Sequence, residues 1–265
     1  MSEVAFRRVV VALDASGESG HALESSIALA CGLGTELVGV FVEDVNVVRM
    51  AAFPAARVLA PGAMSWDVDV PTIERALRVA AAEWRRRLEV DARDRALAVT
   101  FRVARGMVED ELAAAGEEGD LVVVAGHATP GLWSSLAAAA RGSVLILSGG
   151  SRAPRPIVVL SADRVREKAL VGAARVATAT ARPLVVLRSP DSNEEDFQIE
   201  VARALAGLGP RPAEIATAKG VAAVVAAALR RPGAVFAAPD AIASPPSADD
   251  VEELRRAGCS ILFAR

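Results

Sequence analysis

Residues 9–41 read VVVALDASGESGHALESSIALACGLGTELVGVF, and this stretch decides the fold. The apolar run at 9–13 predicts a strand that is buried on both faces, and a second run at 36–42 predicts another. A helical pattern at 18–32 lies between them and follows a turn that contains Asp14. A strand, a helix and a strand in this order indicate a parallel βαβ unit.

The same pattern returns later in the chain. Residues 156–188 read PIVVLSADRVREKALVGAARVATATARPLVVLR and align with 9–41 without a gap, at an offset of 147. Further on the offset is 114, and there Gly106 matches Gly220. The chain is therefore interpreted as two copies of one unit, and the second copy lacks 33 residues between its second and third strands.

Each copy alternates strands with helices, which predicts an α/β fold of two doubly wound parallel-sheet units with five strands each. In the first copy we expect strands near 7–13, 36–42, 98–104, 120–125 and 143–148, and helices near 18–32, 72–94, 107–116 and 132–140. The linker-like sequence GGSRAPR divides the chain into predicted domains 1–150 and 151–265. The long connection 45–72 contains Met, Phe and Trp, which favours a contact surface.

Composition narrows the classes of function. Apolar residues make up 52% of the chain and the net charge is −3, so we expect a well-cored protein without affinity for nucleic acid. The longest uncharged apolar stretch, 221–229, is too short to cross a membrane, and the N-terminus does not read as a signal peptide. Cys31 and Cys259 are expected to be buried structural thiols rather than disulfide partners or metal ligands, which favours a cytoplasmic protein.

Two stretches resemble the universal stress proteins, here in tandem. They are VVVALDASGESGHALESSIALA in the first half of the repeat and VARGMVEDELAAAGEEGDLVVVAGH, residues 103–127, in its second half. The resemblance covers residues 5–148 and, more weakly, 155–265. It implies strand order 3-2-1-4-5, an adenine nucleotide alpha hydrolase-like arrangement, and pairing of units through their last strands. A tandem chain would then form an intrachain pseudo-dimer, and a homodimer of chains is the further possibility that the resemblance implies.

The resemblance also implies a site for ATP or AMP. Asp14, with Ala15 beside it, matches the acid that follows the first strand and lies near the nucleoside. Val40 and Phe41 are the candidates for main-chain contacts to the base. Gly126, His127 and Gly131 are the candidates for the phosphate loop, which in the family reads G-x2-G-x9-G-(S/T).

This sequence departs from that loop. His127, Ala128 and Thr129 occupy the place of the second glycine, and the repeat assigns Gly142–Ser143 to the turn before the last strand. In the second copy Ser161 replaces Asp14, and Asp240 replaces Gly126, which puts a carboxylate where a phosphate would bind. We therefore expect weak or lost ATP binding in the first copy and a structural role for the second.

Two functions remain open on the sequence. The first is a stress-response or regulatory protein that acts by binding a protein partner or a small ligand. The second is an ATP- or AMP-binding universal stress protein with at most slow ATP hydrolysis. A third hypothesis is a nucleotide-binding subunit like that of the electron-transfer flavoproteins, but nothing in the sequence indicates a flavin. No nucleophile, base and orienting group stand together, so we do not expect an enzyme.

Overall fold

The structure is a computed structural model of the 265-residue chain. It describes residues 6–14, 19–53, 57–59, 65–67, 69–125, 132–149, 155–162, 165–208, 212, 214–242 and 246–265. In the N-terminal half the elements are β1 (Arg8–Leu13), α1 (Ser19–Leu33), β2 (Glu36–Asp44), α2 (Val45–Ala51), β3 (Arg57–Leu59), β4 (Ser65–Asp67), α3 (Val70–Arg93), β5 (Val99–Gly106), α4 (Val108–Ala115), β6 (Leu121–Ala125), α5 (Leu132–Ala139) and β7 (Ser143–Leu147). In the C-terminal half they are β8 (Ile157–Ser161), α6 (Arg166–Ala179), β9 (Leu184–Arg188), α7 (Glu194–Ala204), β10 (Glu214–Thr217), α8 (Val221–Arg230), β11 (Val235–Ala237), α9 (Ala248–Arg256) and β12 (Ser260–Ala264).

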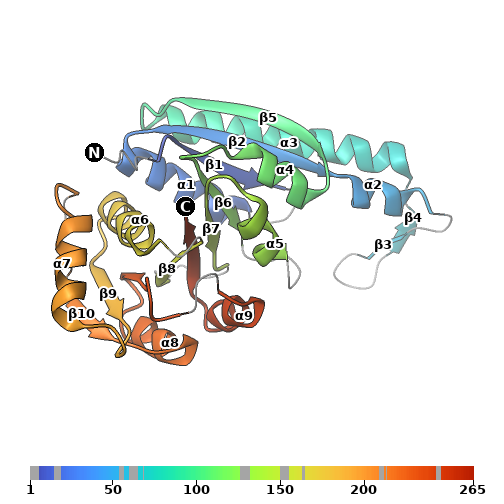
Figure 1. The fold of residues 1–265 in the computed structure, drawn as a ribbon. Helices are drawn as coiled ribbons and strands as arrows, with labels where there is room; N and C mark the ends of the chain where they lie inside the picture. Colours follow the sequence, from blue (N-terminus) through green and yellow to red (C-terminus); the bar gives the residue numbers. More distant parts are fainter. Residues whose placement is uncertain are drawn as a thin grey trace.

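Ten of these strands form one continuous sheet, in the order β10-β9-β11-β8-β12-β7-β6-β1-β2-β5 (Figure 1). All neighbours in it are parallel except β7 and β12, which pair antiparallel with Leu145 opposite Leu262. The last strands of the two halves thus meet, as the sequence comparison implied. Each of these strands covers an edge that the other half would otherwise leave open. The limits 1–150 and 151–265 for separate domains stay a prediction.

Helices cover both faces of the sheet. One face packs against α1, α3, α6 and α7, and the opposite face packs against α4, α5, α8 and α9. Alternate residues of β1 point to opposite faces: Val9 and Val11 pack in the core on the α1 side, and Val10 packs in the core on the α4 side. Near-continuous aliphatic strands are what a sheet buried on both faces requires.

The N-terminal half has the expected order, since its strands run β5-β2-β1-β6-β7, which is 3-2-1-4-5. The C-terminal half differs from the expected order. Its strands run β10-β9-β11-β8-β12, or 3-2-4-1-5, so β11 lies between β9 and β8. The sequence could not reveal this exchange, because both β8 and β11 are fully buried apolar runs with the same pattern.

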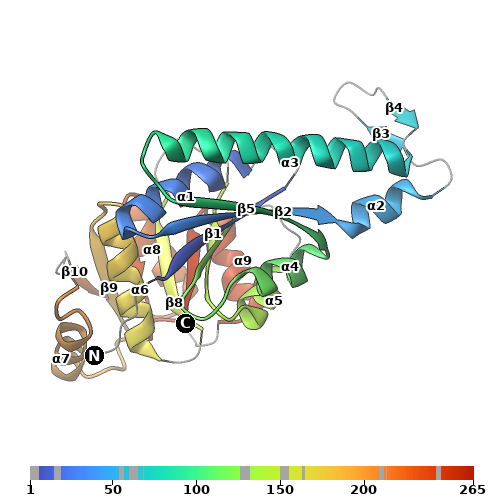
Figure 2. The same cartoon turned by 90° about the horizontal axis from the view of Figure 1, so that it is seen from above.

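The connection after β2 builds structure that the C-terminal half lacks. It contains the short helix α2 and the antiparallel hairpin of β3 and β4, and it leads into the 24-residue helix α3. Asp69 starts α3 by accepting a hydrogen bond from the main-chain nitrogen of Thr72 over 3.0 Å. In Figure 2 the hairpin and α2 lie beyond the end of the main sheet. Within the described residues no helix is both long enough and apolar enough to cross a membrane.

Candidate functional site

In doubly wound sheets ligands bind outside the carboxyl ends of the strands, where neighbouring connections leave to opposite faces. In the N-terminal half this place lies between β1 and β6. Strand β1 is followed by α1 on one face, and β6 is followed by α5 on the other. Asp14 comes directly after β1 and is exposed at this edge.

The groups of Asp14 are held by its neighbours. Its carboxylate Oδ1 accepts a hydrogen bond from the hydroxyl of Ser19 over 2.7 Å, and its main-chain nitrogen donates to the same hydroxyl over 3.0 Å. Ser19 is buried at the first residue of α1. This reciprocal pair fixes the turn between strand and helix, so Asp14 has a structural role in addition to any role in binding.

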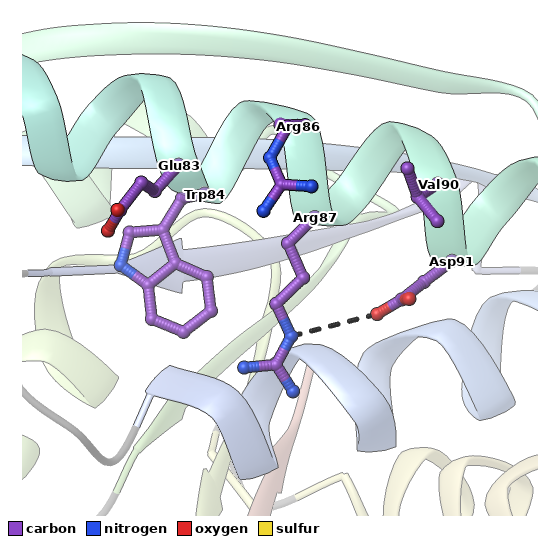
Figure 3. Close-up of a pocket in the computed structure, with 6 residues that line it drawn as sticks. All are labelled: Glu83, Trp84, Arg86, Arg87, Val90 and Asp91. Carbon is purple, nitrogen blue, oxygen red and sulfur yellow. Dashed lines mark ion pairs between the residues drawn. The ribbon is translucent and has the colours of Figure 1, made fainter.

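Trp84 of α3 reaches the same turn. Its indole nitrogen donates to the main-chain oxygen of Asp14 over 2.8 Å. The ring also borders a groove of about 470 Å³ on the α1 side of α3 (Figure 3). The groove is lined by Glu83, Trp84, Arg86, Arg87, Val90 and Asp91. All six residues belong to α3.

Arg87 is one of two arginines that line this groove, and it is already engaged. Its guanidinium pairs with Glu24 of α1 over 3.1 Å and approaches Asp91 to 3.8 Å. It also lies 5.4 Å from the centroid of the Trp84 ring. The three arginines at 85–87 are all exposed. A ligand in the groove would therefore meet an arginine that is partly neutralised by carboxylates.

Val40 and Phe41 lie inside β2, because this strand continues to Asp44. Both residues are fully buried, and β5 pairs with β2 from Leu37 to Asp44. Even-numbered residues of β2 face β1, since Leu37 donates to Ala98 on the other side. The register then places the main chain of Val42 beside the end of β1. Val42 therefore lies nearer to this edge than Val40 and Phe41, because β2 continues two residues beyond the end that the sequence predicted.

The remaining candidates, Ala15, Gly126, His127 and Gly131, lie outside the described residues. The structure does place Gly142–Ser143, and it does so at the start of β7. There the nitrogen of Ser143 donates to the main-chain oxygen of Asp120 over 2.9 Å, at the amino end of the strands. This position is at the opposite edge of the sheet from Asp14, so Gly142–Ser143 is not part of a phosphate loop at the Asp14 edge.

In the C-terminal half Asp240 fills the corresponding edge with its own side chain. The carboxylate is 8% exposed, and its Oδ1 accepts a hydrogen bond from the main-chain nitrogen of Ser189 over 3.0 Å. The hydroxyl of Ser192 donates to Oδ2, and the Arg166 guanidinium lies 3.8 Å from the same oxygen. A carboxylate thus takes the three donors that could hold an anion.

The exchanged strand order explains this contact. Because β11 is next to β9, the turn after β11 that carries Asp240 meets Ser189 just after β9. The sequence singled out Asp240 but missed its partners Ser189, Ser192 and Arg166, because they became neighbours only through the unexpected order. Ser161, which replaces Asp14, is buried at the end of β8 opposite Ala264.

The two cysteines behave differently from each other. Cys259 is buried, as expected, and burial raises its pKa to about 11, although Arg155 opposes the shift. Cys31 is exposed, so the expectation of burial was wrong for it. The buried side of α1 is centred on Ser26 and Ala30, and Cys31 lies outside this side, beyond its border at Ile27. Among the described residues no group of histidine, cysteine and acidic side chains could hold a metal ion.

Solved structures with this fold are known. A universal stress protein from Archaeoglobus fulgidus matches with a TM-score of 0.69 and 13% identity, over 99% of this chain and 98% of its own. A functionally unknown protein from Pseudomonas aeruginosa PAO1 matches with a TM-score of 0.55 and 13% identity, over 98% of this chain and 93% of its own. The chain has the universal stress protein fold. No family model and no curated protein matches it.

The likeness to these universal stress protein structures extends over the whole chain. A candidate universal stress protein from Pseudomonas aeruginosa UCBPP-PA14 also matches over 98% of this chain and 94% of its own, with a TM-score of 0.54 and 15% identity. Such low identities establish the architecture, whereas function depends on particular side chains. The two edges around Asp14 and Asp240 therefore decide what this universal stress protein fold can bind.

Proposed function

We propose that this protein is a universal stress protein-like regulatory protein that acts by binding a protein partner or a small ligand, without high-affinity ATP binding. The observation that supports this most directly is the nearly buried Asp240 carboxylate, which engages the donors at the corresponding edge of the C-terminal half. A triphosphate there would meet a negative charge in a partly desolvated place, which is unfavourable. The C-terminal half then serves to complete the sheet through β12.

In the N-terminal half the proposal rests on Asp14 and on the sequence of the loop after β6. Asp14 accepts hydrogen bonds from the Ser19 hydroxyl and the Trp84 indole, and these bonds stabilise the turn. The loop sequence GHATPG lacks the second glycine of the family pattern, so fewer main-chain N–H groups can converge on phosphate oxygens. A small ligand in the groove beside Trp84 would not need a phosphate-binding loop.

Thermal unfolding of the intact chain with millimolar ATP or AMP tests the proposal. A ligand at one hundred times its Kd adds about 2.7 kcal/mol to the free energy of unfolding, which is readily seen as a raised Tm. We expect no shift with ATP. A large shift that disappears in Asp14→Ala would instead establish the second function, an ATP- or AMP-binding protein. Asp191→Ala, an exposed carboxylate in the C-terminal half, is the matched control.

The second function has one feature in its favour. Asp14 occupies the acid position at the end of β1, next to the start of α1, as the family arrangement requires. Cytoplasmic location and association of two chains remain predictions from the sequence.

A further inference from the structure

We infer that Arg155 and Arg182 form a binding site for a small phosphate-type anion, at the amino ends of the strands of the C-terminal half. Arg155 comes two residues before β8, and Arg182 comes two residues before β9. The Nη1 nitrogen of Arg182 donates to the main-chain oxygen of Arg155 over 2.8 Å, so its guanidinium lies beside the start of β8. The site goes beyond the proposed function, because Asp14 and Asp240 follow the carboxyl ends of their strands.

The Arg155 side chain is held on the α6 side of the sheet. Side chains alternate along extended chain, so Arg155 shares its side with Ile157, which packs in the core beneath α6. A Cβ atom at Gly258 would overlap Nη1 of Arg155, so the guanidinium packs closely on the main chain there. Its Nε is buried and has no hydrogen-bond partner. An unsatisfied buried donor costs stability, and such costs are expected at functional sites.

Neither guanidinium forms an ion pair with a carboxylate among the residues that the structure describes. Burial lowers the pKa of Arg182, and no carboxylate opposes this shift. Main-chain N–H groups of residues 180–182 already bond the last carbonyl groups of α6, so the guanidinia are not needed to satisfy them. Because buried arginines are normally paired with acids, these two half-buried cations are open to an anion from outside the chain.

The segments that border the site contain no acidic residue. They are the end of α1 with its turn, the end of β7, the last two turns of α6, and the chain before β11 and before β12: residues 31–35, 147–149, 172–179, 231–234 and 257–259. The glutamates nearest to these segments in sequence lie elsewhere or are engaged. Glu36 begins β2 on the far side of β1, and Glu214 pairs with Arg231. Glu252 pairs with both arginines that end α9, and this helix, which also carries Glu253, packs on the opposite face of the sheet.

The two guanidinia select the class of ligand. A phosphate dianion has two negative charges and several acceptor oxygens, which match two positively charged forks of N–H donors. A carboxylate would neutralise only one of them. Free phosphate and a phosphate monoester of a metabolite present the same group, so the test uses both.

Isothermal titration calorimetry of the intact chain with inorganic phosphate, glycerol phosphate and acetate, at constant ionic strength, tests the proposal. Calorimetry is preferred to thermal unfolding, because phosphate stabilises most proteins by exclusion from their surface. We expect a Kd for phosphate of about 1 mM or lower, and binding of acetate at least about tenfold weaker. Tighter binding of glycerol phosphate than of phosphate would support the site and assign it to a phosphorylated metabolite.

Variants locate the binding. Arg155→Gln should weaken phosphate binding at least about tenfold. Arg231→Gln is the matched control, because Arg231 lies at the same edge but is paired with Glu214, and it should retain binding within about twofold. Arg182→Gln should also lose at least about tenfold, and it keeps the test decisive if Arg155→Gln unfolds.

Three results would overturn the proposal: no heat of binding at about 10 mM phosphate, equal affinity for acetate, or unchanged binding in folded chains with Arg155→Gln or Arg182→Gln. Phosphate binding that is lost in Asp14→Ala but kept in Arg155→Gln would also overturn it, because the anion would then bind at the Asp14 edge. Titrations with ATP report separately on the proposed function.

Discussion

The indole nitrogen of Trp84 and the main-chain oxygen of Asp14 are joined by a hydrogen bond of 2.8 Å, which ties α3 to the turn after β1. These residues are separated by 70 positions in sequence. The bond therefore couples the long connection, present only in the N-terminal half, to the edge where a ligand would bind. Ser19 holds the same turn from α1.

Trp84→Phe should measure the strength of this tie. Phenylalanine keeps an aromatic ring against the core but lacks the N–H, so we expect the free energy of unfolding to fall by about 1 kcal/mol. Urea unfolding followed by far-UV circular dichroism is the suitable measurement, because the substitution itself changes tryptophan fluorescence. An unchanged midpoint would mean that water replaces the indole donor at no cost.

Asp240→Ala should measure how much the Asp240 carboxylate contributes to the free energy of unfolding. The change leaves the Ser189 nitrogen without its acceptor in a partly buried place, and we expect a loss of about 1–3 kcal/mol in the free energy of unfolding. Asp191→Ala is the control, because Asp191 pairs with Lys219 over 2.6 Å while both side chains are about two-thirds exposed. That exposed pair should contribute at most about 1 kcal/mol. Equal losses in the two variants would contradict a special role for Asp240.

The packing of the two halves depends on a close approach between α1 and α6. A Cβ atom at Gly32 would overlap the main-chain oxygen of Ala179, and a main-chain atom cannot move away as a flexible side chain can. Gly32→Ala should therefore push the helices apart and cost about 1–3 kcal/mol.

Gly233→Ala provides the comparison for this prediction. A Cβ at Gly233 meets no atom within 4 Å, so the change should stay within about 0.5 kcal/mol. Urea midpoints of the two variants give the difference. If both glycines tolerate alanine equally, the helices are not packed as closely as the structure places them.

Much of the fold could be predicted from the sequence, because aliphatic runs and helical spacing specify each element locally. The order of β8 and β11 could not, since two buried strands with the same pattern can exchange places without exposing any apolar residue. For the same reason the partners of Asp240 were not foreseen. The position of Asp14 at the end of β1 could be predicted because it follows an apolar run directly, whereas its contact with Trp84 depends on how α3 packs, which no local pattern encodes.

Thiol labelling should distinguish the two cysteines. In the native chain at pH 8 we expect rapid reaction at the exposed Cys31 and no reaction at Cys259, whose raised pKa and burial both suppress the thiolate. Unfolding in denaturant should release the second thiol. Fast labelling of both thiols in the native chain would contradict the burial of Cys259, and Cys31→Ser leaves a single thiol with which to check the assignment.

The same thiol gives stability a dependence on alkaline pH. Its pKa is about 11 in the folded chain against 9.0 for an unperturbed thiol, so the folded state retains the proton longer than the unfolded state. The stabilisation is complete below pH 9 and is lost as the pH rises through about 11, because ionisation then favours the unfolded chain. Between pH 9 and about pH 11 the free energy of unfolding of the parent chain should fall relative to that of Cys259→Ala. Parallel curves for the two proteins would show that burial does not hold the thiol neutral.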